Sequence, residues 1–204
     1  MTDAIQALGL TEVDVQALGV DALAGSGYKG MLAMEGMGFL YLSDAMLPQV
    51  NPVFACYNAA MTVDREARAI QCLDPMDARK LEAGTIPFSS IYVLGAALEQ
   101  FRRIGPDRIA AHVSRCYETA YRGLEALGYR MATPFDPDRR CNSFLVCTER
   151  EAELTDFRQR RGVYVSTGKH GYVRISVAPF TSGEDIQRLL EAAAAWRAEQ
   201  KEST

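Results

Sequence analysis

The fold is decided by residues 20–43, which read VDALAGSGYKGMLAMEGMGFLYLS. Two short apolar runs, VDALAGS and GMGFLYLS, stand on either side of the glycine-rich segment GSGYKGMLAMEG. Apolar runs of this length, bounded by glycines, are typical of buried strands, and the segment between them is typical of a turn. We therefore expect two central parallel strands of an α/β sheet, joined by a loop that carries Lys29.

Residues 25–30, GSGYKG, match the G-x-G-x-x-G pattern of dinucleotide-binding proteins. In that pattern a helix begins at the glycines, so that its N-terminus faces a pyrophosphate. Here two more glycines follow and the chain runs into a second strand. A Walker A loop is excluded because Lys29 is followed by Gly30 and not by Ser or Thr. The glycines therefore do not predict nucleotide binding.

The chain beyond this segment predicts helices and then short strands. Residues 44–83 are polar and irregular, contain three prolines, and receive no assignment. Apolar spacing predicts one helix over residues 89–103 and a second over 106–127, with Gly128 as the residue after its cap. Gly105 and Pro106 separate the two helices.

The C-terminal part predicts an α+β arrangement. Three short runs, GYRMATP, NSFLVCT and HGYVRISV, are strand candidates. Ser182 and Asp185 form a capping box at the start of a last helix, which we expect to end near Ala198. We predict two domains: residues 1–88 as the end of an α/β domain with a mostly parallel sheet, and residues 89–204 as a smaller α+β domain.

The composition is that of a soluble globular protein, with 48% hydrophobic and 24% charged residues among 204. A formal charge of -4, without a run of Lys or Arg, predicts no binding to nucleic acid or to an anionic membrane. The N-terminus carries no basic segment before an apolar one, and no apolar stretch is long enough to span a bilayer. We expect a cytoplasmic protein.

The cysteines and histidines predict neither disulfides nor a metal site. The five cysteines are irregularly spaced and contain no C-x-x-C pair. The two histidines, His112 and His170, belong to no known ligand spacing. Buried thiols and no bound metal are therefore expected.

Lys29 has two interpretations on its own. A lysine in a glycine-rich turn is most often a solvated loop residue. Lys29, however, directly follows a buried strand and is flanked by Gly27 and Gly30, which allow other backbone or a ligand to approach closely. An amine desolvated in a cleft of this kind becomes a nucleophile.

Four blocks of the sequence decide between these interpretations. DAIQALG, VDALAGSGYKGMLAMEGMGFLYL, LEAGT and YVRISVAPFTSGEDIQRLLEA resemble, in this order, the second half of the class V aminotransferase and cysteine desulfurase-like family. The resemblance implies the end of the large domain of a fold-type I enzyme, followed by its small domain. It also implies pyridoxal 5'-phosphate (PLP) as cofactor and an amino acid as substrate.

The resemblance implies a role for each matching residue. Lys29 would bind PLP covalently and then move the proton at the substrate α-carbon. Asp3 would pair with the pyridine nitrogen, and Gln6 would hydrogen-bond the ring hydroxyl. Ser26 and Tyr28 match positions around the phosphate, and Tyr28 stands where the family more often has histidine.

Two further positions complete the implied site. Thr85 resembles a threonine that reaches the phosphate in the neighbouring subunit, which makes a dimer part of the site; an ordinary helix-entry turn is the alternative. Arg174 alternates with apolar neighbours, so it projects from one strand face, where a guanidinium can bind a substrate carboxylate. A surface salt bridge is the alternative for Arg174.

The resemblance also limits the activity. No cysteine lies between Phe157 and Arg174, where desulfurases of the family carry the cysteine that forms a persulfide. Transamination, epimerisation or racemisation, and lyase chemistry therefore remain open. Only Met1 and Thr2 precede Asp3, so the N-terminal half of the family fold is expected to be missing. We expect a truncated or split chain, a subunit that needs a separate N-terminal partner chain, or a non-catalytic module.

Overall fold

The computed structural model describes residues 1–51, 53, 61–72, 77–82, 84–137, 140–148, 161–167 and 171–202. The chain folds as two compact units. The first comprises Met1–Leu8 and Val13–Arg103, and the second comprises Gly9–Glu12 and Ile104–Thr204. Across these described ranges, no helix is both long and apolar enough to cross a membrane. Each unit contains at least one sheet and one helix.

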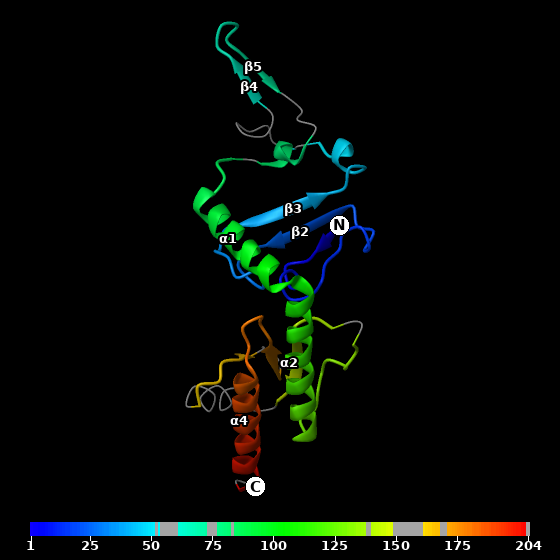
Figure 1. Ribbon diagram of the computed structural model, residues 1–204, viewed down its shortest axis with the longest axis vertical. Coiled ribbons are helices and arrows are strands. Elements are labelled where there is room, and N and C mark those ends of the chain that lie inside the picture. Colours follow the sequence, from blue (N-terminus) through cyan, green and yellow to red (C-terminus); the bar gives the residue numbers. More distant parts are fainter. Residues whose placement is uncertain are drawn as a thin grey trace. The chain divides into compact units, whose positions relative to one another are not determined.

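The sheet of the first unit has three strands in the order β1-β2-β3 (Figure 1). They are β1 (Thr2–Asp3), β2 (Ala22–Ser26) and β3 (Gly38–Leu42). β1 pairs with β2 in parallel, while β2 and β3 are antiparallel. The expectation of two parallel strands is therefore wrong for β3. A parallel crossover needs a dozen or more residues and usually a helix, whereas residues 27–37 form only turns.

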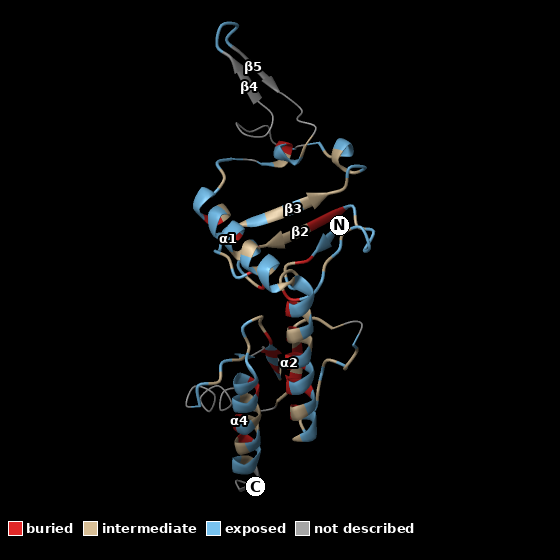
Figure 2. Cartoon of the chain, viewed as in Figure 1, coloured by how far each residue is buried: buried red, intermediate tan, exposed pale blue. Residues whose placement is uncertain are grey.

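Helix α1 (Phe88–Ile104) lies alongside β2 and β3 in Figure 1 and confirms the predicted helix with one more residue at each end. Its inner face buries Ser90 and Leu94. Phe88 and Tyr92 of α1 expose their aromatic side chains, and much of the α1 ribbon is pale blue, the colour of exposed residues, in Figure 2. Apolar residues on several sides of one helix are typical of a helix that packs on more than one surface.

The segment without a sequence assignment forms short elements. They are the 3-10 helix η1 (Leu47–Gln49), the antiparallel hairpin of β4 (Met61–Asp64) and β5 (Ala69–Cys72), and the 3-10 helix η2 (Ala78–Leu81). Lys80 in η2 is almost fully buried, and its Nζ donates to the carbonyl of Leu47 at 2.6 Å. This contact ties η2 to the chain that follows β3.

The sheet of the second unit has the order β6-β8-β7, with all pairs antiparallel. The runs NSFLVCT and HGYVRISV are confirmed as β6 (Ser143–Cys147) and β8 (Tyr172–Ser176). GYRMATP forms no strand, because it contributes only an isolated bridge from Met131 to Val146. The two-residue strand β7 (Ser166–Thr167) was not predicted.

Two long helices cover one face of this sheet. α2 (Pro106–Ala126) and α4 (Gly183–Glu202) lie side by side (Figure 1), and both match the predicted helices. Phe144 of β6 meets the rings of Tyr117 and Tyr121 of α2 at centroid distances of 5.0 and 5.2 Å. These edge contacts between aromatic rings form the centre of the core of the second unit.

The C-terminus of α2 and the N-terminus of α4 are capped at the positions that the sequence predicts. Gly128 follows α2 with a φ of +83°, and Arg197 of α4 donates to the carbonyls of Leu127 and Gly128, each at 2.7 Å. At the start of α4 the backbone N–H of Ser182 donates to the Asp185 carboxylate at 2.8 Å, and the N–H of Asp185 donates to the Ser182 hydroxyl at 3.1 Å. The capping box is therefore confirmed.

This capping box makes stability depend on pH. Hydrogen bonds from the backbone N–H and hydroxyl of Ser182 lower the pKa of Asp185 from its usual 3.8. A carboxyl whose pKa is lowered in the folded state stabilises the protein above its unfolded pKa, and this contribution is lost as pH falls through the folded pKa. We expect wild type to be more stable than Asp185→Asn by a constant amount near neutral pH. This difference in the free energy of unfolding should shrink below pH 3.8.

Urea unfolding of both proteins at several pH values measures this difference, with Glu184→Gln as control in the same helical turn. An Asp185→Asn variant that loses stability with pH in parallel with wild type would contradict the prediction.

Candidate functional site

Lys29 lies in the loop that follows β2, and backbone hydrogen bonds fix this loop. The N–H of Gly27 donates to the carbonyl of Met37 at 3.0 Å, and the N–H of Ala33 donates to the carbonyl of Gly27 at 2.8 Å. The carbonyl of Lys29 itself accepts from the N–H of Leu32 at 2.9 Å. The lysine is therefore held by a closed turn and not by a loose connection.

The Lys29 side chain is half-buried and lies next to Tyr28. Its Nζ is 5.8 Å from the centroid of the Tyr28 ring, within the range of a cation–π contact. The Tyr28 side chain is itself 41% exposed. Both functional groups are accessible from outside the first unit.

Asp3 ends β1, the strand that runs parallel to β2. Asp3 is opposite Ala24 in the register, and the N–H of Ala4 donates to the Ala24 carbonyl at 2.9 Å. The Asp3 carboxylate is exposed and accepts from the N–H of Ile5 at 3.0 Å. Because parallel strands end at the same edge of a sheet, Asp3 and the Lys29 loop leave the sheet at one edge.

Two other predicted residues lie near these strand ends. Gln6 is exposed in the turn after β1. Ser26 is the last residue of β2, is half-buried, and donates its hydroxyl to the carbonyl of Met37 at 3.2 Å. The first unit therefore brings Asp3, Gln6, Ser26, Tyr28 and Lys29 to the carboxyl ends of two adjacent strands.

Two glycines in this region allow neighbouring parts of the chain to pack closely. A Cβ added at Gly27 would lie 3.2 Å from Ala33 and 3.3 Å from Leu94 of α1. A Cβ added at Gly38 would lie 2.8 Å from the carbonyl oxygen of Gly25, across the β2–β3 pair. The close approach predicted at Gly27 is therefore made by other parts of the chain.

Thr85 and Arg174 lie apart from these strand ends in the sequence. Thr85 is exposed, between η2 and α1, in the first unit. Arg174 belongs to the second unit, in the middle of β8. Its neighbours Val173 and Ile175 are buried while Arg174 is exposed, as the predicted alternation requires.

The sequence analysis missed one residue that contacts a predicted one. Ser166 in β7 accepts a hydrogen bond from Nη2 of Arg174 at 3.3 Å. In the sequence, the β-branched residues Val163 and Val165 alternate with Tyr164 and Ser166. This period of two is typical of a strand and could have identified β7.

Cys116 does not form a second reactive site in the part of the chain that the structure describes. Its Sγ lies 3.6 Å from the carbonyl of Thr181 and 3.7 Å from Nε2 of His112. Burial raises the pKa of the Cys116 thiol, which disfavours the nucleophilic thiolate. Cys56 and His170 lie outside the described residues.

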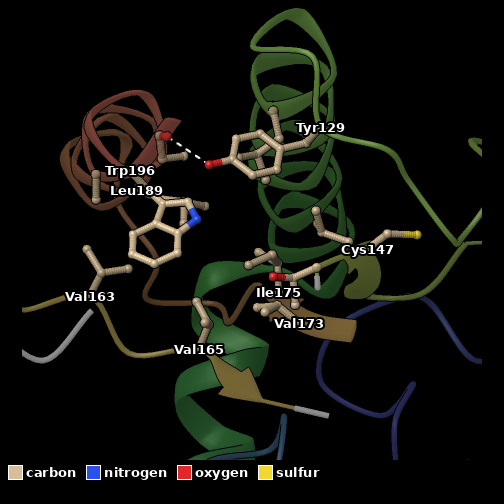
Figure 3. Close-up of a pocket in the computed structure, with 13 residues that line it drawn as sticks. Tyr129, Cys147, Val163, Val165, Val173, Ile175, Leu189 and Trp196 are labelled. Atoms are coloured by element: carbon tan, nitrogen blue, oxygen red, sulfur yellow. Dashed lines mark hydrogen bonds between the residues drawn. The ribbon is translucent and has the colours of Figure 1, made fainter. Parts of the chain in front are cut away.

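The second unit contains an apolar pocket of about 60 Å³ (Figure 3). Trp196 and Leu189 of α4, Val173 and Ile175 of β8, and Tyr129 are among its lining residues. The hydroxyl of Tyr129 donates to the carbonyl of Ala193 at 2.8 Å, and burial raises the pKa of Tyr129 to about 12. No charged side chain lines the pocket, so it does not suit a ligand that carries a phosphate.

Lys29 and Asp3 thus place an amine and a carboxylate at the carboxyl ends of two adjacent strands. In α/β proteins this edge of the sheet is a common position for a ligand site, so it is the candidate cofactor site here. The sequence profile described as aminotransferase class-V matches residues 1–189. The chain therefore belongs to the class V aminotransferase family, which is PLP-dependent.

Similar proteins agree with this assignment. An uncharacterized aminotransferase of Schizosaccharomyces pombe is 28% identical over 192 residues, which are 93% of this chain and 48% of that protein. The apo structure of a cysteine desulfurase from Thermococcus onnurineus has a TM-score of 0.84 at 22% identity, and the match covers 95% of this chain and 51% of that one.

A structure of C-DES with glycine covalently linked to its PLP cofactor has a TM-score of 0.79 at 20% identity, covering 93% of this chain and 49% of that one. These structural similarities establish the fold. The chain spans about half the length of each of these relatives.

The close contact of Gly38 with Gly25 predicts a cost for a side chain at this position. We expect Gly38→Ala to lower the free energy of unfolding by about 1–3 kcal/mol, because the β2–β3 pair must open to accept the methyl group. Urea unfolding followed by circular dichroism measures the change.

Gly95 in α1 provides the matched control, because a Cβ there meets no atom within 4 Å. Gly95→Ala should raise the free energy of unfolding by about 0.5–1 kcal/mol, as expected for alanine in a helix. Equal effects of the two substitutions would show that the Gly38–Gly25 contact does not constrain the strand pair.

Proposed function

We propose that this chain is part of a PLP-dependent enzyme that acts on an amino acid, with Lys29 as the residue that binds the cofactor. One observation carries the proposal: in a member of the class V aminotransferase family, Lys29 and Asp3 leave the sheet at the same edge of two adjacent parallel strands. An amine and a carboxylate at one edge are the donor set that PLP requires.

When bound, PLP supplies an electron sink for the carbanion that forms at the substrate α-carbon. The Lys29 amine would attach the cofactor and then take the proton from the substrate α-carbon and return it. The Asp3 carboxylate would hold the proton on the pyridine nitrogen, and the Gln6 amide would orient the ring through its hydroxyl. Each role requires a group that can be reached from outside the first unit, and Asp3, Gln6 and Lys29 are all exposed or half-exposed.

The phosphate and the substrate carboxylate would be held by the remaining residues. Ser26 and Tyr28 carry hydroxyls beside the Lys29 loop, and the Ser26 hydroxyl must leave the Met37 carbonyl to donate to a phosphate. Thr85 would contribute a hydroxyl from the neighbouring subunit. Arg174 would bind the substrate carboxylate, and in the described part of the chain it forms no ion pair that competes for its guanidinium.

Among the reactions open to such a site, transamination, epimerisation and lyase chemistry are favoured over sulfur transfer. Sulfur transfer through a protein persulfide needs a cysteine that can reach the substrate. Residues 158–173 contain none, although relatives include cysteine desulfurases. The sequence therefore favours reactions in which the carbanion is reprotonated or loses a leaving group.

The proposed domains differ from the two compact units, because residues 89–103 fall in the first unit and residues 9–12 in the second. We propose that residues 1–88 end the cofactor-binding domain and that residues 89–204 form the small α+β domain. The other half of the site would come from a segment equivalent to the unmatched half of the relatives, in a cytoplasmic homodimer or heteromer. The alternative is a non-catalytic or heteromeric subunit that needs a separate N-terminal partner chain.

The proposal is tested by adding PLP to the purified chain, alone and with the unmatched half of the Schizosaccharomyces pombe relative. We expect visible absorption from lysine-bound PLP, and mass spectrometry after borohydride reduction should locate the label on Lys29. Lys29→Ala should lose the signal, while Lys201→Ala should retain it.

Two results would contradict the proposal. Failure to bind PLP in both mixtures would contradict the enzymatic function. Labelling of another lysine in wild type, or an unchanged spectrum of Lys29→Ala, would contradict the role of Lys29.

A further inference from the structure

One face of the second sheet is covered and the other is open. Val173 and Ile175 of β8 are buried on the face that α2 and α4 cover, together with Phe144 and Val146 of β6. Tyr172, Arg174 and Ser176 of β8 point to the opposite face and are exposed. Arg174 is the middle residue of the open face.

Arg174 is flanked by one residue of each neighbouring strand. In the register, Leu145 of β6 and Ser166 of β7 both stand directly opposite Arg174. Residues directly opposite in antiparallel strands have Cβ atoms about 4.5–5.5 Å apart, so their side chains interact. Leu145 is half-buried and offers an apolar surface to the aliphatic part of Arg174, while Ser166 receives the hydrogen bond from Nη2 at 3.3 Å.

The charge of Arg174 is not neutralised within the described residues. None of their carboxylates lies within 4.0 Å of its guanidinium, whereas Arg102 and Arg103 each pair with Glu99. The alternative interpretation of Arg174 as a surface salt bridge is therefore not supported in this part of the chain. A serine hydroxyl accepts one N–H and adds no negative charge, so the guanidinium keeps its charge and four other N–H donors.

We propose that Ser166 is a positioning residue, which orients the Arg174 guanidinium to bind the carboxylate of an amino-acid substrate. This inference rests on the proposed function for the identity of the ligand. A free arginine side chain loses rotamer freedom when it binds, and this loss weakens binding. The hydrogen bond to Ser166 already restricts the Arg174 side chain before the carboxylate binds. Less rotamer freedom is therefore lost when the carboxylate binds.

The orientation of Arg174 can be measured without cofactor or substrate. The side-chain Nε–Hε group of Arg174 gives an NMR signal that Arg174→Lys identifies by its loss, and its heteronuclear NOE reports the rigidity of the guanidinium. We expect Ser166→Ala to lower this NOE and Ser166→Thr, which keeps the hydroxyl, to restore it.

Ser176→Ala is the matched control, because Ser176 lies on the same face of β8 and forms no side-chain hydrogen bond within the described residues. It should leave the Arg174 signal as in wild type, and all three serine variants should keep the melting temperature of wild type. A purely structural role of Ser166 would instead lower the melting temperature and leave the Arg174 NOE unchanged.

The outcomes separate this inference from the proposed function. If the Arg174 NOE is the same in wild type and Ser166→Ala, the positioning role is wrong, whatever Lys29 binds. If the NOE falls in Ser166→Ala and recovers in Ser166→Thr while Lys29 binds no PLP, Ser166 positions Arg174 and the proposed function is wrong.

Discussion

The parallel pairing of β1 with β2 is the constraint on which the candidate site depends. The pairing sets Asp3 opposite Ala24, and the bond from Ala4 to the Ala24 carbonyl holds the chain just beyond Asp3. Because side chains alternate along a strand, a shift of one residue would turn Asp3 to the other face of the sheet. β1 has only two residues, so this register depends on few hydrogen bonds. In larger parallel sheets, neighbouring strands and covering helices stabilise such a pair.

The second constraint is the antiparallel return of β3, which closes the Lys29 loop. Met37 lies just before β3, and its carbonyl accepts from both the N–H of Gly27 and the hydroxyl of Ser26. The carbonyl therefore connects the two ends of the loop. A residue that performs chemistry must be held within a narrow geometry, and a closed turn with internal hydrogen bonds provides this better than a free loop. The antiparallel direction of β3, which was wrongly expected to be parallel, is thus the feature that fixes the Lys29 loop.

The sequence predicts the helix ends correctly, because they depend on residues that are close together in the chain. The capping box at Ser182 and the glycine at 128 predict the ends of α4 and α2, because caps involve residues close in sequence. Strand direction depends on pairing between separate segments, so β3 was placed correctly but was wrongly expected to be parallel. The β4–β5 hairpin carries no glycine or asparagine in its turn, residues 65–68, and Arg68 adopts a φ of +51° instead. Without this usual signal, the hairpin was not predicted.

The residues of the candidate site were predicted from the sequence, but a contact between two strands was not. Lys29 and Asp3 were predicted from the resemblance to the family, and Arg174 from that resemblance together with alternation along a strand. The contact of Ser166 with Arg174 requires strand pairing and was missed. Lys29 is only half-buried in this chain. An amine becomes an effective nucleophile when water is excluded from it. If Lys29 binds the cofactor as proposed, further surfaces must exclude water from its amine. The relatives are about twice as long as this chain, and the proposed function assigns this surface to a segment equivalent to their unmatched half.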